Sequence, residues 1–161
     1  MIELKFPSNI KNVLESEGVK AAYKALDSLD DSKYKKTKML CLADVVESVL
    51  FIYEKQYPND LRVRNCINGI RDYCNDKISE EELNKLREDV NNIANYLADN
   101  ASDVISDDAA DVAYAVAYAV YDFDADVYDF AAAVACAVAY CCANDTDAQW
   151  QKNEDILKKY L

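Results

Sequence analysis

A stretch of 64 residues, from Glu88 to Gln151, contains neither lysine nor arginine. It carries 13 acidic residues, and the rest of the chain has a net charge of +1, so this stretch accounts for the protein's net charge of −12. Its commonest residue is alanine, which has the highest helix propensity of all residues. Small side chains also let helices approach closely. We therefore expect this stretch to form acidic, tightly packed helices.

Apolar side chains recur along this stretch at intervals of three and four residues, the spacing of one face of a helix. The main stripe consists of Val112, Val116, Val120, Phe123, Val127, Phe130, Val134 and Val138. A second stripe consists of Tyr114, Tyr118 and Tyr121. We interpret the valines and phenylalanines as core residues. The tyrosines suit a core or an interface, because each ring carries a polar hydroxyl.

The composition of the whole chain favours the all-α class. Its 161 residues include only two glycines and two prolines, too few for the turns of an all-β sandwich or barrel. The length suits one domain over residues 1–161, with short N-terminal helices (1–31), central helices (32–99) and an acidic Ala/Tyr-rich C-terminal half (100–161). The chain opens without a signal-peptide pattern, and its apolar runs are too short to cross a bilayer. We expect a cytoplasmic protein with no membrane contact.

Helix caps and helix breakers predict a compact bundle of seven or eight helices. Ser8 is expected to cap a first helix that ends at Gly18, and a second helix follows over residues 19–29. A third helix is expected to begin near Ser32 and to continue until Pro58, because proline disfavours helical geometry in the residue before it.

The second half of the chain has similar boundary patterns. The Asn-Asp pair after the proline is expected to cap the next helix, and Ser79 with Glu82 forms a capping box that opens a longer one. Helix is expected to resume at Ser106. The acidic residues at 122–126 indicate either a break or one continuous helix, and the last helix follows the sequence NDTD.

Nothing in the sequence indicates catalysis, a metal or a cofactor. The chain has no histidine, and its six cysteines are never spaced as C-x-x-C, so we interpret the cysteines as reduced and structural. Asp122 and Asp126 could serve as a paired acid and base, but aspartates on an Ala-rich helix are more typical of a solvated face. We predict a protein that is not an enzyme and binds no cofactor.

The sequence YEKQYPNDLRVRNCINGIRDYCNDKISEEEL, the Ala-rich tract and the closing AQWQKNEDILKKYL resemble an alanine-rich helical family of immunity proteins from bacteria and their phages. The resemblance covers residues 41–161, and its most specific part is YPNDLRVR, where the family pattern reads YP-x-D-x-RPR. The matching positions are Tyr57, Pro58, Asp60, Arg62 and Arg64. Val63 stands where the family has a proline. The resemblance implies a protein that neutralises a toxin.

We interpret these five matching residues as structural. Arg62 and Arg64 are one residue apart on a helix and therefore reach different neighbours. Arginine is also the base that best suits bidentate pairing with a carboxylate. We expect both arginines to pair with carboxylates of neighbouring helices and to anchor the turn after Pro58.

The bias toward Lys, Asn, Asp, Ile and Tyr resembles proteins of T-even phages, among which the inhibitors of the host Lon protease are similar in size and character. This resemblance implies a homodimer in the host cytoplasm that binds an ATP-dependent protease and blocks it without being cleaved. A homodimer also agrees with the Ala-rich helices, whose Val, Tyr and Phe residues are too numerous for one buried stripe, so that a second face is expected to meet another copy.

A one-sided acidic surface steers association with a basic protein. The residues expected to contact the partner are Asp99, Asp103, Asp107, Asp108, Asp111, Asp122, Asp126, Tyr114 and Tyr118. Direct binding of nucleic acid is disfavoured, because the charge has the wrong sign. Three functions therefore stay open: a non-catalytic inhibitor of a host enzyme with a basic surface, an acidic mimic of nucleic acid, and a toxin-neutralising immunity protein. If the acids only aid solubility, we expect the contact surface in the turn at 57–64 and the N-terminal helices.

Overall fold

The computed structural model describes residues 4–100, 104–121, 129, 131, 132, 134 and 146–161. The helices of this part of the chain are α1 (Ser8–Glu17), α2 (Val19–Asp27), α3 (Asp31–Glu47), α4 (Leu50–Gln56), α5 (Arg62–Cys74), α6 (Glu80–Asp99), α7 (Val104–Tyr121) and α9 (Thr146–Lys158). These eight helices, with no strand among the described residues, confirm the prediction of an all-α fold with seven or eight helices. None of the described helices combines the length and the apolar character that a membrane span requires.

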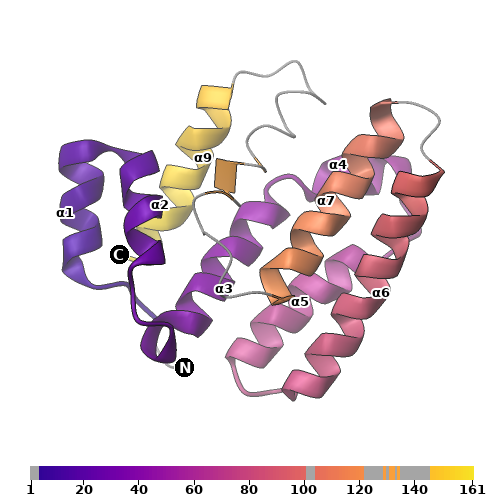
Figure 1. The fold of residues 1–161 in the computed structure, drawn as a ribbon, viewed down its shortest axis with the longest axis horizontal. Helices are drawn as coiled ribbons and strands as arrows, with labels where there is room; N and C mark the ends of the chain where they lie inside the picture. The colour runs from indigo at the N-terminus through magenta and orange to yellow at the C-terminus, as the bar shows by residue number, and fades with distance from the viewer. Residues whose placement is uncertain (1–3, 101–103, 122–128, 130, 133, 135–145) are drawn as a thin grey trace.

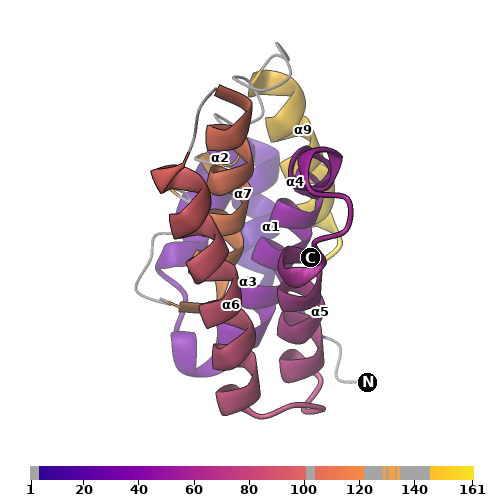
Figure 2. The ribbon, with the colours of Figure 1, turned by 90° about the vertical axis from the view of Figure 1, so that its right-hand side faces the viewer.

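Helix α3 lies between two groups of helices (Figure 1). The larger group contains α4, α5, α6 and α7, in which α6 packs along α7 and α5 contacts both. The smaller group contains α1, α2 and α9, in which α2 contacts the other two. Helix α3 contacts α5 and α7 of the first group and α9 of the second. Figure 2 shows α6 and α7 running side by side on the face of the larger group that points away from α1 and α2.

Helix α7 is enclosed by its neighbours α3, α4, α5 and α6. Its buried residues are Ala109, Ala110, Val112, Ala113, Val116 and Ala117. Because most of these side chains are small, the neighbouring helices can approach on several sides. The described members of the predicted apolar stripe, Val112, Val116 and Val134, are all buried. The side chains of the other stripe residues lie outside the described part of the chain.

Two predicted helix boundaries are confirmed. Gly18 follows the last residue of α1 with φ 87° and ψ 177°, a conformation that side chains other than glycine rarely adopt. Ser79 and Glu82 form the complete capping box of α6, with each side chain bonded to the other residue's backbone N–H. The predicted cap at Ser8 is wrong by one residue, because the extended Pro7 precedes the helix and Ser8 is its first member.

The single helix predicted to end before Pro58 is instead two helices, α3 and α4, separated by Ser48 and Val49. Ser48 Oγ donates a hydrogen bond to the Val45 carbonyl (2.6 Å) and accepts one from Gln149 Nε2 (2.9 Å). A serine hydroxyl bound to a backbone carbonyl competes with helical hydrogen bonds. Since Gln149 lies on α9, far along the chain, the local sequence pattern could not predict this break.

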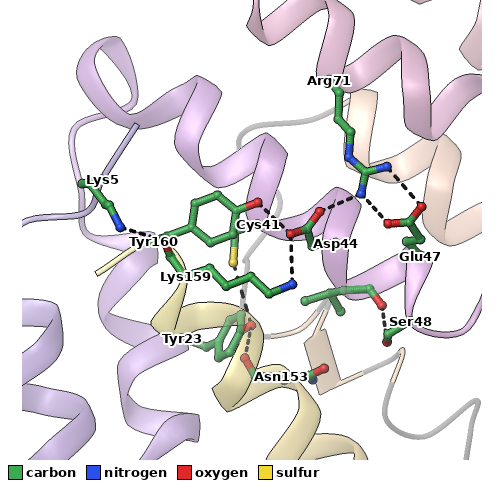
Figure 3. A network of polar contacts seen from close by, with 11 residues as sticks. Lys5, Tyr23, Cys41, Asp44, Glu47, Ser48, Arg71, Asn153, Lys159 and Tyr160 are labelled. Carbon is green, nitrogen blue, oxygen red and sulfur yellow. Dashed lines mark hydrogen bonds and ion pairs between the residues drawn. The ribbon is translucent and has the colours of Figure 1, made fainter. Parts of the chain in front are cut away.

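A polar network joins α3, α5 and the end of the chain (Figure 3). Asp44 Oδ1 accepts a hydrogen bond from Arg71 Nη2 at 2.7 Å. Its Oδ2 accepts one from the Tyr160 hydroxyl at 3.0 Å, and Lys159 Nζ lies 3.7 Å from the same oxygen. Arg71 also pairs with Glu47 at 2.5 Å. The Asp44 side chain is only 18% exposed, so this cluster is partly shielded from water.

The N-terminal helices are held to α9 by a second set of contacts. The buried Tyr23 of α2 donates its hydroxyl to the Asn153 carbonyl at 2.9 Å, and its ring lies edge-on to Trp150, with centroids 5.9 Å apart. The backbone N–H of Phe6 donates to the Tyr160 carbonyl at 2.7 Å. The two ends of the chain are therefore fixed to each other as well as to α3.

We expect Asp44→Asn to lower the free energy of unfolding by about 2 to 3 kcal/mol, because the side chain loses its charge and one of its two acceptor oxygens, and a hydrogen bond to a charged group is worth about 1.5 to 3 kcal/mol. Asp72→Asn is the matched control, since Asp72 pairs with Lys77 at 2.9 Å where both side chains are well exposed. It should cost less than about 1 kcal/mol. Urea denaturation measures both. Equal losses in the two variants would contradict the central place of Asp44.

Candidate partner-binding surface

The charge of helix α6 changes along its length. Near its start, Glu81 pairs with Lys85 one turn later at 3.0 Å. From Glu88 onward the helix contains no base. Glu88, Asp89 and Asp99 are exposed, and among the described residues none of the three has a base within ion-pair distance. The second half of α6 therefore presents three carboxylates that no base in the described part of the chain contacts.

Asp99 is the last residue of α6, and the last turn contains no basic residue. The C-terminal end of a helix carries a partial negative charge, so a carboxylate there costs roughly 0.3 to 1 kcal/mol. A base would be the favourable residue at this position. The placement of Asp99 therefore works against helix stability.

The structure places the predicted contact residues unevenly. Asp99 and Asp111 are exposed on α6 and α7, and Tyr114 on α7 is partly buried. Asp107, Asp108 and Tyr118 belong to α7, but their side chains are outside the described part of the chain. Asp103, Asp122 and Asp126 lie outside the described residues altogether.

Tyr114 joins the two acidic helices. Its hydroxyl donates a hydrogen bond to Asn95 Oδ1 of α6 at 2.6 Å, and its ring packs against the core. This tyrosine therefore fixes α7 against α6 and leaves only part of its ring for a partner.

The turn between α4 and α5 contains the matching family positions. Its backbone is closed by a hydrogen bond from the Asp60 N–H to the Tyr57 carbonyl at 3.0 Å. The Asp60 carboxylate accepts from the backbone N–H and from Nε of Arg62, both at 3.0 Å, and pairs with Arg62 Nη2 as well. Leu61 occupies the cap position of α5, so the predicted cap at Asn59 or Asp60 is wrong by one or two residues. Carboxylate and guanidinium thus form a fork that fixes the turn.

The second arginine of the turn pairs across two helices. Arg64 Nε and Nη2 donate to the two carboxylate oxygens of Glu54 on α4 at 2.6 and 2.7 Å. The pair is bidentate, but the two side chains are 43% and 30% exposed. It links α4 to α5 at the surface, and solvent screening limits its energetic contribution.

A hollow of about 670 Å³ opens at this turn, and its walls come from residues 56–62 and 65. Tyr57, Pro58 and Leu61 supply apolar walls, and the side-chain amides of Asn59 and Asn65 supply polar groups. The residues of this turn predicted a structural role only, and the hollow beside them was not predicted. The turn chemistry of the Tyr-Pro-Asn-Asp sequence indicates a bend, not the open space beside it.

The described cysteines have no catalytic environment. Cys41, Cys66 and Cys74 are free and buried. Burial raises the pKa of each thiol to about 12, so these thiols stay protonated and weakly reactive at neutral pH. Cys136, Cys141 and Cys142 lie outside the described residues. Within the described chain, no group of histidine, cysteine and carboxylate side chains is arranged to hold a metal ion.

The hydrogen bonds from Arg62 lower the pKa of the Asp60 carboxyl to about 2. A carboxyl whose pKa falls on folding stabilises the folded state above its unfolded pKa, near 3.9, and this contribution is lost as the pH falls toward 2. Since Arg62 is 47% exposed, we expect Asp60→Asn to cost about 1 kcal/mol at pH 7. Urea denaturation from pH 7 to pH 2 should show the two proteins converging below pH 4. A difference that does not change with pH would contradict this role.

Comparison with known proteins identifies a family. Residues 30–156 match the family model described as Imm-5 like putative immunity protein. No curated protein and no solved structure matches the chain. The family match includes α3 to α7, the turn between α4 and α5, the acidic surface and most of α9, and it leaves out α1 and α2. Because this match spans more than three-quarters of the sequence, the chain belongs to the Imm-5 like putative immunity protein family.

Proposed function

We propose that this protein is an immunity protein that binds a basic toxin through the acidic surface of α6 and α7 and blocks it without catalysis. The observation that carries the proposal is the concentration of 13 acids with no base in residues 88–151. Membership of an immunity-protein family suggests that the partner is a toxin. The negative charge suggests that the toxin binds through a basic surface.

Several bases outside this stretch pair with carboxylates that also lie outside it, as in Glu54 with Arg64 and Asp44 with Arg71. Acids concentrated in one stretch repel one another and destabilise the compact state. A partner that brings lysines and arginines removes this repulsion on binding. Such a surface also attracts its partner over roughly 8 to 10 Å at moderate salt, which raises the association rate.

We expect the double variant Asp99→Asn/Asp111→Asn to slow association with the toxin about three- to ten-fold at low salt and to flatten the salt dependence of the rate. The partner to use is the toxin encoded beside the gene of this protein. Glu15→Gln/Glu17→Gln is the matched control, because it removes the same charge from exposed positions on α1, outside the family match. Surface plasmon resonance at several salt concentrations measures the rates.

The control variant should associate at the wild-type rate apart from a small effect of net charge. If Asp99→Asn/Asp111→Asn binds and protects cells as the wild type does, and only its solubility falls, the acidic surface serves solvation and the contact surface lies elsewhere. Circular dichroism of both variants separates lost contacts from lost folding.

Two other targets follow from the composition. The bias toward Lys, Asn, Asp, Ile and Tyr is what suggests a phage-encoded inhibitor of the Lon protease in the host cytoplasm. Such an inhibitor should survive incubation with that protease and slow the degradation of a second substrate. The acidic charge also suits a mimic of nucleic acid, which should compete with DNA for a basic groove. If the protein does not protect against the toxin and one of these two results is obtained, the protease or the DNA-binding protein replaces the toxin as the proposed target.

Self-association stays a prediction. The buried residues of α7 already contact α3, α4, α5 and α6 of the same chain, so these apolar side chains do not require a second copy. The sequence-based argument for a homodimer therefore depends on residues outside the described part of the chain. Light scattering separates a dimer from the 18.2 kDa monomer.

A further inference from the structure

The turn between α4 and α5 is more rigid than a connecting loop needs to be. The backbone N–H of Tyr57 donates to the Tyr53 carbonyl at 2.9 Å, and that of Asn65 donates to the Leu61 carbonyl at 2.8 Å. The Tyr57 ring lies against the Tyr53 ring with centroids 5.4 Å apart. With Pro58 in its bend and the Asp60–Arg62 fork beside it, the turn has few alternative conformations. A surface fixed in this way loses little entropy when it binds a partner.

Within this rigid turn, Leu61 exposes 54% of its surface and lines the hollow of about 670 Å³. A single exposed leucine is ordinary on a protein surface. This one differs because it stands at an open hollow whose other apolar walls are Tyr57 and Pro58. An aliphatic side chain fixed beside a pocket can serve as the anchor of a protein interface. Gln56, Asn59 and Asn65 add polar residues to the lining of the same hollow.

Arg62, one wall of the hollow, is the first residue of α5, which packs against α6. Asp89, the second acid of the stretch without bases, is near enough to Arg62 to raise the pKa of that guanidinium, after the larger effect of the Asp60 hydrogen bond. Asp60 itself already binds Arg62 through both oxygens. The pair is neutral, so the hollow is an uncharged, partly apolar site at the border of a strongly negative surface.

We propose that this hollow receives an apolar side chain of the partner protein, flanked in the partner's sequence by lysine or arginine, and that Leu61 is the anchor of this contact. The inference rests on the proposed function, because the basic partner is the same protein that α6 and α7 attract. The flanking bases face Asp89, while the apolar side chain displaces water from Leu61, Tyr57 and Pro58. The acids thus govern how fast the partner arrives, and the hollow governs how long it stays.

Two short peptides test the chemistry on the full chain. Acetyl-Gly-Lys-Leu-Arg-Gly-amide carries the apolar side chain between two bases, and acetyl-Gly-Lys-Ala-Arg-Gly-amide keeps only the bases. We expect the leucine peptide to shift the backbone amide signals of residues 59–65 in a ¹⁵N-labelled sample, and to bind there about five-fold more tightly than the alanine peptide, because of the apolar area it buries. Leu61→Ala should abolish the difference between the peptides, and Leu61→Met, which keeps the volume, should preserve it.

The inference is overturned if both peptides shift residues 59–65 equally, or if both shift only the amides near Asp99 and Asp111. The spectrum of each variant also reports whether it is folded. Toxin binding then separates the two proposals. Suppose that Asp99→Asn/Asp111→Asn slows association while Leu61→Ala leaves the dissociation rate unchanged. This result supports the proposed function and contradicts the role of Leu61 as an anchor. If the leucine peptide binds at the hollow but the protein gives no protection against the toxin, the proposed function is contradicted and the apolar binding site is supported.

Discussion

The fold depends on one partly buried carboxylate, that of Asp44 on the central helix α3. Its two oxygens take an arginine from α5 and a tyrosine hydroxyl from the end of the chain. Both groups of helices pack against α3, so this carboxylate lies where the two groups meet. Burial and the nearby Asp44 charge raise the pKa of Tyr160, which keeps the phenol protonated as a donor. Removal of the carboxylate would leave Arg71 with Glu47 alone and the tyrosine hydroxyl without its acceptor.

This arrangement explains how the protein can carry so uneven a charge. The ion pairs that hold α3, α4 and α5 together use carboxylates that precede residue 88, and Glu154 on α9 pairs with Lys158. The core of α7, in contrast, is held by alanine and valine packing, which needs no charge. These ion pairs thus use acids outside residues 88–151. The exposed acids in the second half of α6 can therefore face another molecule, at the cost of some mutual repulsion.

Some of the local chemistry predicted from the sequence agrees with the structure, although the caps predicted for α1 and α5 are displaced by one or two residues. Gly18 and the Ser79–Glu82 box were predictable because the cause and the effect lie within a few residues. The break between α3 and α4 was not, because it involves a hydrogen bond between Ser48 and Gln149, about a hundred residues apart. The same limit applies to Asp44, whose partners come from two distant parts of the chain, α5 and the residues after α9.

The candidate site was likewise predictable from the sequence only in part. The acidic stretch was visible in composition alone, and Asp99 and Asp111 do lie exposed on α6 and α7. The hollow was not predictable, because a cavity depends on how the side chains around a turn are arranged in space. Charge acts over roughly 8 to 10 Å and tolerates imprecise geometry, whereas apolar contact needs matching surfaces within about 4 Å. A surface that attracts many basic proteins through its charge therefore needs a short-range feature to choose among them, and the rigid turn with Leu61 supplies a feature of that kind beside the acids.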